Sequence, residues 1–143
     1  MEIVSEWFPR ELLGAPMVPE QLAKEVDELK NAGYTIWMEE KGDGFIHVII
    51  QNYPLPEGYN KKLTDLLVKV PVSYPNGYPD MFWVDVNLTL ADGRGPKSTT
   101  KENIFGKDWL RFSWHPGKWN PGRDDLETYL GFINNGVGGA RNV

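Results

Sequence analysis

A serine and a histidine that stand two residues apart are the most chemically suggestive pair in this chain. Ser113 offers a hydroxyl nucleophile, and His115 is the side chain best suited to remove its proton near neutral pH. Residues two apart on an extended backbone share a face with Cα atoms about 6.5 Å apart, so a direct hydrogen bond needs a bend or a motion on binding. A carboxylate that orients the imidazole would complete a triad, and the candidates are Asp108, Asp124 and Asp125.

Large aromatic and basic side chains surround this pair. The tryptophans are expected to pack the neighbouring loop and, as a second role, to wall a groove that keeps water from an acyl ester. Arg111 is either a solvated cation or a contact for an acidic partner surface. The candidate catalytic residues are Ser113, His115 and Asp124, and the candidate substrate-binding residues are Trp109, Arg111, Trp114 and Trp119.

Composition removes several classes of function. The chain has no cysteine, which excludes disulfides, thiolate metal sites and a thiol nucleophile. Two distant histidines make a zinc site improbable, and neither a metal nor another cofactor is expected. A net charge of -5 without a cluster of basic residues argues against nucleic-acid binding. No apolar run is long enough for a membrane span and no signal peptide is evident, so we expect a cytoplasmic protein without a membrane partner.

The N-terminal half predicts a helix and then a hairpin. Residues 1–18 contain three prolines and are expected to form an arm, and residues 19–135 form one domain. A helix of about 13 residues is expected with Pro19 at its first position, apolar side chains spaced at four and three residues and a cap at Gly33. The period then changes to two, and YTIWMEE and FIHVIIQ around KGDG predict two antiparallel strands. His47 lies on the second strand and is expected to be a packed strand residue.

The remaining segments predict two more strands, a flap and a second helix. LTDLLVKVPV is the third strand, and the alternating apolar residues of MFWVDVNLTL form the fourth. The polar, glycine-rich residues 91–108 are expected to be an irregular flap that leads to the active-site loop. A C-terminal helix over 124–134 would start with Asp124 and Glu127 as a capping box. Residues 136–143 are expected to be a flexible tail.

This order of elements resembles the ubiquitin-conjugating enzyme (UBC) superfamily. The resemblance depends on Tyr74-Pro75 after the third strand, the polar flap, Trp119-Asn120-Pro121 and the C-terminal helix. The strings PLPEGYN, YPDMFWVD and WHPGKWNPGRDDLETYL are similar to bacterial members of the superfamily, the prokaryotic family E type. It implies an α+β, UBC-like domain with a four-stranded antiparallel meander. It also implies a ubiquitin-like protein, an activating enzyme and a JAB-type peptidase as partners.

The resemblance also directs attention to Ser113. In the standard enzymes the catalytic cysteine lies about eight residues before the tryptophan of the Trp-x-Pro motif, and the same count from Trp119 reaches residues 111–113. Ser113 is the nucleophile there. The family's His-Pro-Asn tripeptide is missing, and Asn103 or Asn120 are weak substitutes for its asparagine.

Three hypotheses remain open. Ser113 accepts a ubiquitin-like C-terminus as an oxyester and passes it to an amine. Alternatively, the chain is a catalytically inert UBC-like module that positions a ubiquitin-like protein or an activating enzyme. The third hypothesis is that the natural protein carries a cysteine at position 113, and the wild-type codon decides it.

Overall fold

The structure is a computed structural model that describes residues 18–140. The predicted arm over 1–18 therefore lies outside the described residues, except for Val18. Helix α1 spans Glu20–Asn31 and helix α2 spans Leu126–Ala140. The strands are β1 Thr35–Glu40, β2 Phe45–Pro54, β3 Leu63–Pro71, β4 Phe82–Asp85, β5 Thr99–Ile104 and β6 Lys107–Phe112.

The sheet is larger than the meander that the sequence predicts. Within the described residues, six strands pair antiparallel in the order β1-β2-β3-β4-β6-β5. The α+β class is confirmed, and β1 to β4 are neighbours in chain order, as in the predicted meander. The sheet nevertheless has more than four strands, and the flap predicted over 91–108 is irregular only in its first part, because β5 and β6 form a hairpin across residues 99–112. This hairpin turns at Phe105 and Gly106, which both have positive φ. β5 is an edge strand of mostly exposed polar residues, so it lacks the apolar alternation by which a strand is found in sequence.

Other predicted elements are confirmed. The β1–β2 hairpin forms around Asp43 and Gly44, and β3 pairs with β2 along most of its length. Gly33 follows α1 with a φ of 110° and allows the chain to turn into β1. The fourth strand is shorter than expected because the chain turns away after Asp85, and Leu88 reaches the core from outside the strand.

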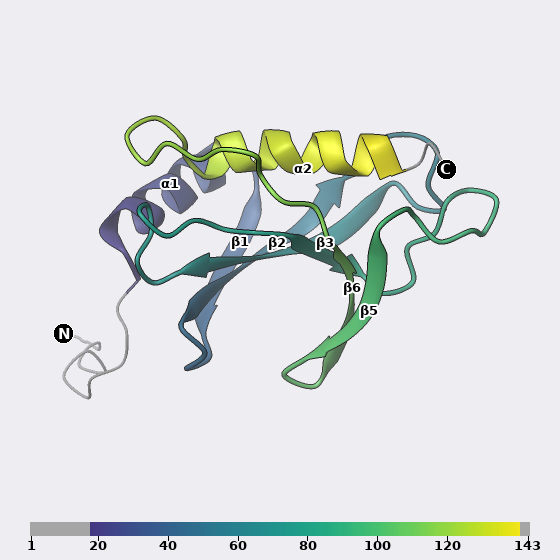
Figure 1. Ribbon diagram of the computed structural model, residues 1–143, viewed down its shortest axis with the longest axis horizontal. Coiled ribbons are helices and arrows are strands. Elements are labelled where there is room, and N and C mark those ends of the chain that lie inside the picture. The colour runs from purple at the N-terminus through teal and green to yellow at the C-terminus, as the bar shows by residue number, and fades with distance from the viewer. Residues whose placement is uncertain (1–17, 141–143) are drawn as a thin grey trace.

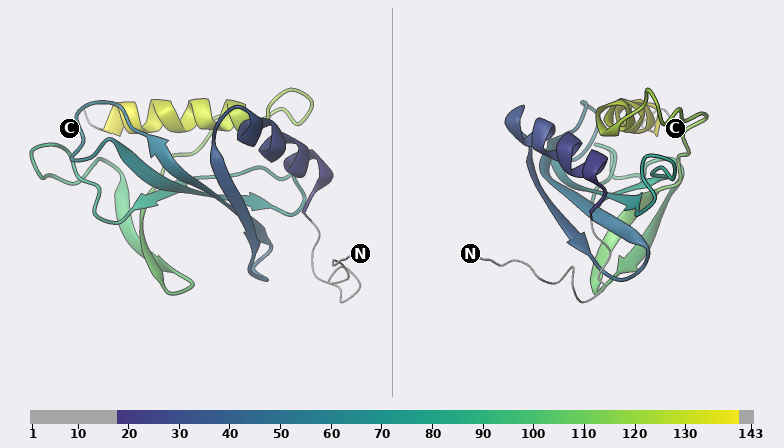
Figure 2. Two further views of the ribbon diagram at one scale, coloured as in Figure 1. Left: turned by 180° about the vertical axis from the view of Figure 1, so that it is seen from behind. Right: turned by 90° about the vertical axis from the view of Figure 1, so that its left-hand side faces the viewer.

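Strand alternation divides the side chains between the two faces of the sheet. Ile46, Val48 and Ile50 of β2 point toward the two helices and join the main core with the apolar side of α2. The next residues in register point the other way, where Leu67, Trp83, Ile104 and Trp109 form a second apolar cluster. Both helices lie on one side of the sheet, whereas the β1–β2 and β5–β6 hairpins project toward the other side (Figures 1 and 2). We call the helix-free side the outer face.

Helix α2 starts one residue later than the capping-box prediction. Asp125 Oδ1 accepts hydrogen bonds from Thr128 N at 2.8 Å and Thr128 Oγ1 at 2.9 Å, so Asp125 is the N-cap. Asp124 instead accepts from Asn120 N at 2.7 Å and closes the preceding loop. The prediction of Asp124 and Glu127 as a capping box is therefore wrong, because the chain is still turning at Asp124.

Helix α2 also extends further than predicted. Its last residue is Ala140, so residues 136–140 are helical rather than part of a tail. A Cβ atom at Gly139 would lie 3.1 Å from the Trp114 ring, and one at Gly136 would lie 3.3 Å from Phe82. Glycine lowers helix propensity, which explains the predicted tail, but at these two positions it allows the helix to approach the rings closely.

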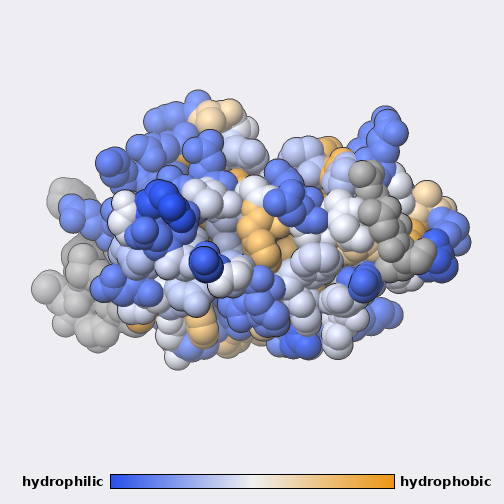
Figure 3. All heavy atoms as spheres, turned by 45° about the horizontal axis from the view of Figure 1, so that its top comes forward, coloured by the Kyte–Doolittle hydropathy of each residue, from blue (hydrophilic) through white to orange (hydrophobic). Residues whose placement is uncertain are grey.

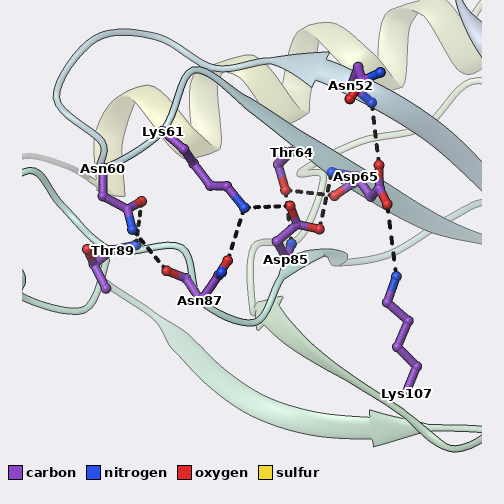
Figure 4. A network of polar contacts seen from close by, with 9 residues as sticks. All are labelled: Asn52, Asn60, Lys61, Thr64, Asp65, Asp85, Asn87, Thr89 and Lys107. Atoms are coloured by element: carbon purple, nitrogen blue, oxygen red, sulfur yellow. Dashed lines mark hydrogen bonds and ion pairs between the residues drawn. The ribbon is translucent and has the colours of Figure 1, made fainter.

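Polar contacts join the start of β3 and the loop before it to the end of β4, and one ion pair reaches β6 (Figure 4). Lys61 Nζ lies 2.7 Å from Asp85 Oδ2 and donates to Asn87 at 3.0 Å. Lys107 at the start of β6 lies 4.0 Å from Asp65 of β3.

The side that Figure 3 shows, with the helices turned forward, is largely hydrophilic around a narrow hydrophobic strip. Among residues 18–140, no helix combines the length and apolar character that crossing a membrane requires.

Candidate functional site

Ser113 lies immediately after β6 on the outer face. Its backbone N–H donates to Ser98 O at 2.9 Å, which extends the pairing of the β5–β6 hairpin by one step. The side chain is half-buried. Arg111 lies on the same face two residues earlier, and its Nε donates to Ser113 Oγ at 3.3 Å. Strand alternation thus places a fixed cation beside the hydroxyl.

A chain of polar contacts fixes the orientation of Arg111. Its Nη1 donates to Glu102 Oε1 of β5 at 3.2 Å, and the same oxygen accepts from Trp83 Nε1 of β4 at 3.0 Å. The indole is buried, whereas the Arg111 and Glu102 side chains are about one-third exposed. Three neighbouring strands therefore contribute to one arrangement that holds the guanidinium against Ser113.

His115 is paired with a residue that the sequence did not single out. Its Nδ1 donates to Asp80 Oδ1 at 2.7 Å, across from the start of β4. Both side chains are accessible, with 62% and 49% exposed. Within the described residues, Ser113 and His115 share no hydrogen bond. An imidazole that donates from Nδ1 keeps Nε2 as its basic nitrogen, which is the arrangement that a triad requires of its histidine.

The predicted carboxylate partners lie elsewhere. Asp124 closes the loop before α2, and Asp125 caps that helix. Asp108 accepts from Asn103 Nδ2 at 2.9 Å beside the tip of the β5–β6 hairpin. Asn120 uses its side-chain oxygen to accept from Gly122 N. None of these contacts in the described structure joins Asp124 to His115, and Asp80 has the position that Asp124 was expected to hold.

The three tryptophans divide between different regions. Trp109 is buried on the outer face, with Lys107 Nζ 4.1 Å from the centre of a ring. Trp114 points the other way and packs against α2, and its buried Nε1 has no hydrogen-bond partner among the described residues. Trp119 Nε1 donates to Pro75 O at 2.9 Å, and its ring stacks on Tyr78 at 5.6 Å. Their packing role is evident, and Arg111 is the predicted substrate-binding residue that touches Ser113.

Asp80, Glu102 and Trp83 are the residues that sequence reasoning missed. Asp80 is 35 positions from His115, and only the pairing of β4 with β6 brings the two together. Glu102 lies in the segment that was expected to be a flap. Among the described residues, no group of three histidine or carboxylate side chains is arranged to hold a metal ion.

A helix, an antiparallel sheet and a tryptophan-bearing loop before a second helix are the elements expected of the ubiquitin-conjugating enzyme class. Within that class, the chain belongs to prokaryotic E2 family E, whose family model matches residues 22–138. Family membership links the chain, at a general level, to ubiquitin-like conjugation with a ubiquitin-like protein and an activating enzyme. The catalytic cysteine of the standard enzymes is absent from the sequence. No curated protein and no solved structure matches the chain.

Proposed function

We propose that the chain accepts the activated C-terminus of a ubiquitin-like protein as an oxyester on Ser113 and transfers it to an acceptor amine. The supporting observation is the setting of the hydroxyl: Arg111 donates to its oxygen, and the His115–Asp80 pair follows two residues later. A serine hydroxyl is a weak nucleophile without a base, so the nearby imidazole is essential to the proposal.

The proposed reaction has two steps. His115 Nε2 takes the proton of the Ser113 hydroxyl, either after a rotation of the imidazole or through one water molecule. The serine oxygen bonds to the activated carbonyl carbon, and the bond to the leaving group of the activating enzyme breaks with its electron pair. His115 passes that proton to the departing group of the activating enzyme and is neutral again. In the second step, an amine attacks the ester carbonyl and loses a proton to His115, and the Ser113 oxygen leaves and takes this proton from His115. Arg111 offsets the negative charge that develops beside Ser113.

A catalytically inert binding module is the second candidate. It is favoured by the absence of a hydrogen bond between Ser113 and His115 in the described structure and by the exposure of the imidazole. In this case the chain positions a ubiquitin-like protein or an activating enzyme without forming a covalent bond to either. A JAB-type peptidase of the same pathway is a further partner that we propose for both candidates.

The two candidates are separated by incubating the chain with the ubiquitin-like protein and activating enzyme of its pathway and ATP. Oxyester formation gives an adduct that hydroxylamine cleaves and thiol reductants leave intact. Ser113→Ala should abolish the adduct, whereas Thr100→Val, which removes another hydroxyl opposite Arg111, should retain it. Binding of the ubiquitin-like protein without an adduct would support the module and refute the enzyme.

The proposed roles of the neighbours give graded outcomes. His115→Gln and Asp80→Asn should each slow adduct formation, by about 10²-fold or more for the base itself. Arg111→Gln should slow adduct formation, because it removes the cation beside Ser113. An unchanged rate in His115→Gln would remove the base from the proposal, even if Ser113 still carried the ester.

A further inference from the structure

The outer face carries a cavity of about 210 Å³. Ile49 of β2 and Leu67 of β3 line it, and the β5–β6 hairpin bends across so that the Phe105 ring meets the His47 ring edge-on at 5.7 Å. An apolar cavity of about 150 Å³ is already large enough to hold benzene. This cavity therefore has room for one large aromatic side chain.

The rim of the cavity is unusually aromatic for a solvent-exposed surface. Trp37 of β1 is 41% exposed and Phe105 is 59% exposed, although large aromatic side chains are usually mostly buried. Trp109 also lines the cavity, but its ring is buried. Exposed rings around a concave site are typical of a surface that another chain segment covers.

The charges on the rim indicate what kind of segment fits. Lys41 lies 3.4 Å from Glu39, and Lys107 lies 4.0 Å from Asp65, so each cation is beside an anion. Such a rim gives little preference for a strongly charged partner. It suits a segment with an aromatic anchor between residues of mixed charge.

The N-terminal residues 1–17 of the same chain have this composition. The sequence MEIVSEWFPRELLGAPM carries Trp7 and Phe8 between Glu6 and Arg10. The residue before a proline prefers an extended backbone, and an extended Trp7-Phe8 pair would project its two rings to opposite sides. One ring can enter the cavity while the other covers the exposed face of Trp37.

The chain leaves the described domain at a suitable place. Val18 packs against the main core, which fixes the point of departure. The start of α1 lies on the same side of the molecule as the β1–β2 hairpin (Figures 1 and 2). The ten residues from Phe8 to Val18 span up to about 33 Å when extended, whereas a domain of this size has a radius of gyration of roughly 14 Å. The tether therefore reaches the cavity.

We propose that residues 1–17 fold back over the outer face and that the Trp7-Phe8 pair fills the cavity between Trp37 and Phe105. Because the segment is tethered, its effective concentration at the cavity is in the millimolar range, so a modest intrinsic affinity suffices. The outer face is then covered by the chain itself, and any partner that uses this face must first displace the segment.

The absence of cysteine makes a direct test possible. In a Ser5→Cys variant of the full chain, a nitroxide attached to the new thiol is the only paramagnetic centre. We expect it to broaden the ¹⁵N-detected amide signals of Ile49, Leu67 and Phe105, and to leave those of exposed Gly131 on α2 unaffected. Adding Phe105→Asn should remove the broadening without unfolding the chain, because asparagine tolerates the positive φ at this turn. Replacing Trp7 and Phe8 with alanine should have the same effect.

Three results would overturn the proposal. The first is a labelled chain in which the amides of the outer face are no more broadened than Gly131. The second result concerns a mixture of equal amounts of a ¹⁵N chain without nitroxide and a ¹⁴N chain with nitroxide. Broadening of the ¹⁵N signals in this mixture would assign the cavity to a second copy. The third is perturbation of the same amides by the ubiquitin-like protein in a chain where the label has no effect, which would assign the face to that partner.

Discussion

The side chain of Glu25 joins the two helices and the loop before β4, and its replacement is the sharpest test of how the fold is held. It is buried in α1, where Oε1 accepts from Tyr74 OH at 2.5 Å and from Leu126 N at 2.8 Å. Its other oxygen accepts from Gln21 Nε2 at 2.5 Å. Leu126 is the first residue of α2, so a carboxylate from α1 satisfies an amide that the helix itself cannot pair.

The cost of losing this side chain follows from the groups that it leaves behind. Glu25→Ala leaves the Tyr74 hydroxyl and the Leu126 amide buried without acceptors, at about 1–3 kcal/mol each, so we expect a loss of about 4 kcal/mol. Glu25→Gln keeps an acceptor oxygen but replaces charge-assisted bonds with neutral ones and removes an anion from a helix N-terminus, while relieving the burial of a charge. We expect a loss of about 1–2 kcal/mol.

Urea denaturation followed by tryptophan fluorescence measures these losses as shifts in midpoint at constant slope. Glu28→Ala and Glu28→Gln are the matched controls, because Glu28 lies one turn away on the exposed side of α1 and should change stability by less than about 0.5 kcal/mol. A double-mutant cycle with Tyr74→Phe should show a coupling of about 1 kcal/mol or more. If Glu25→Ala is no less stable than Glu28→Ala, the reasoning about the buried carboxylate is wrong.

Three further outcomes are expected. Gly131→Ala should stabilise the protein by about 1 kcal/mol because the added Cβ meets open space. Gly139→Ala should destabilise it by about 1 kcal/mol or more because the added Cβ would lie 3.1 Å from Trp114. Chemical denaturation of both variants measures the two changes. Burial raises the pKa of Tyr53 to about 12, so the folded state favours the neutral phenol. The free energy of unfolding should therefore fall as pH rises from about 10 to 12. Denaturation at each pH should show a shallower fall in Tyr53→Phe. Trp119→Phe keeps a ring against Tyr78 but loses the bond to Pro75 O, and should cost about 1 kcal/mol, less than Trp119→Ala; equal losses in thermal unfolding would contradict this order.

Helix α1 and the β1–β2 hairpin could be predicted from the sequence because each has a strong local pattern. Leu22, Val26 and Leu29 follow the helical period, and their burial confirms it. The glycines around Asp43 mark a turn between two runs of alternating residues. In contrast, β5 is polar except for Ile104 at its end and gains its structure from pairing with β6, so no local pattern distinguishes it from a flap.

The candidate site was only partly accessible to the same reasoning. Ser113, Arg111 and His115 were chosen from residue type, from spacing and from a resemblance. Their partners Asp80 and Glu102 belong to other strands, and a sequence read along one dimension cannot say which strands become neighbours. Asp124 was a reasonable orienting group by proximity in the chain, but its carboxylate is used by Asn120 N.

The sequence by itself determined the residues that can react, the absence of a thiol, the period of each main element and the family. These are properties of residue type and local spacing, which need no knowledge of long-range contacts. Only the tertiary structure decided that Arg111 lies against Ser113, that Asp80 rather than Asp124 holds His115, and that the outer face contains a cavity with an aromatic rim. Each of these depends on which strands pair and in which register, and a shift of one residue would turn the side chains to the opposite face.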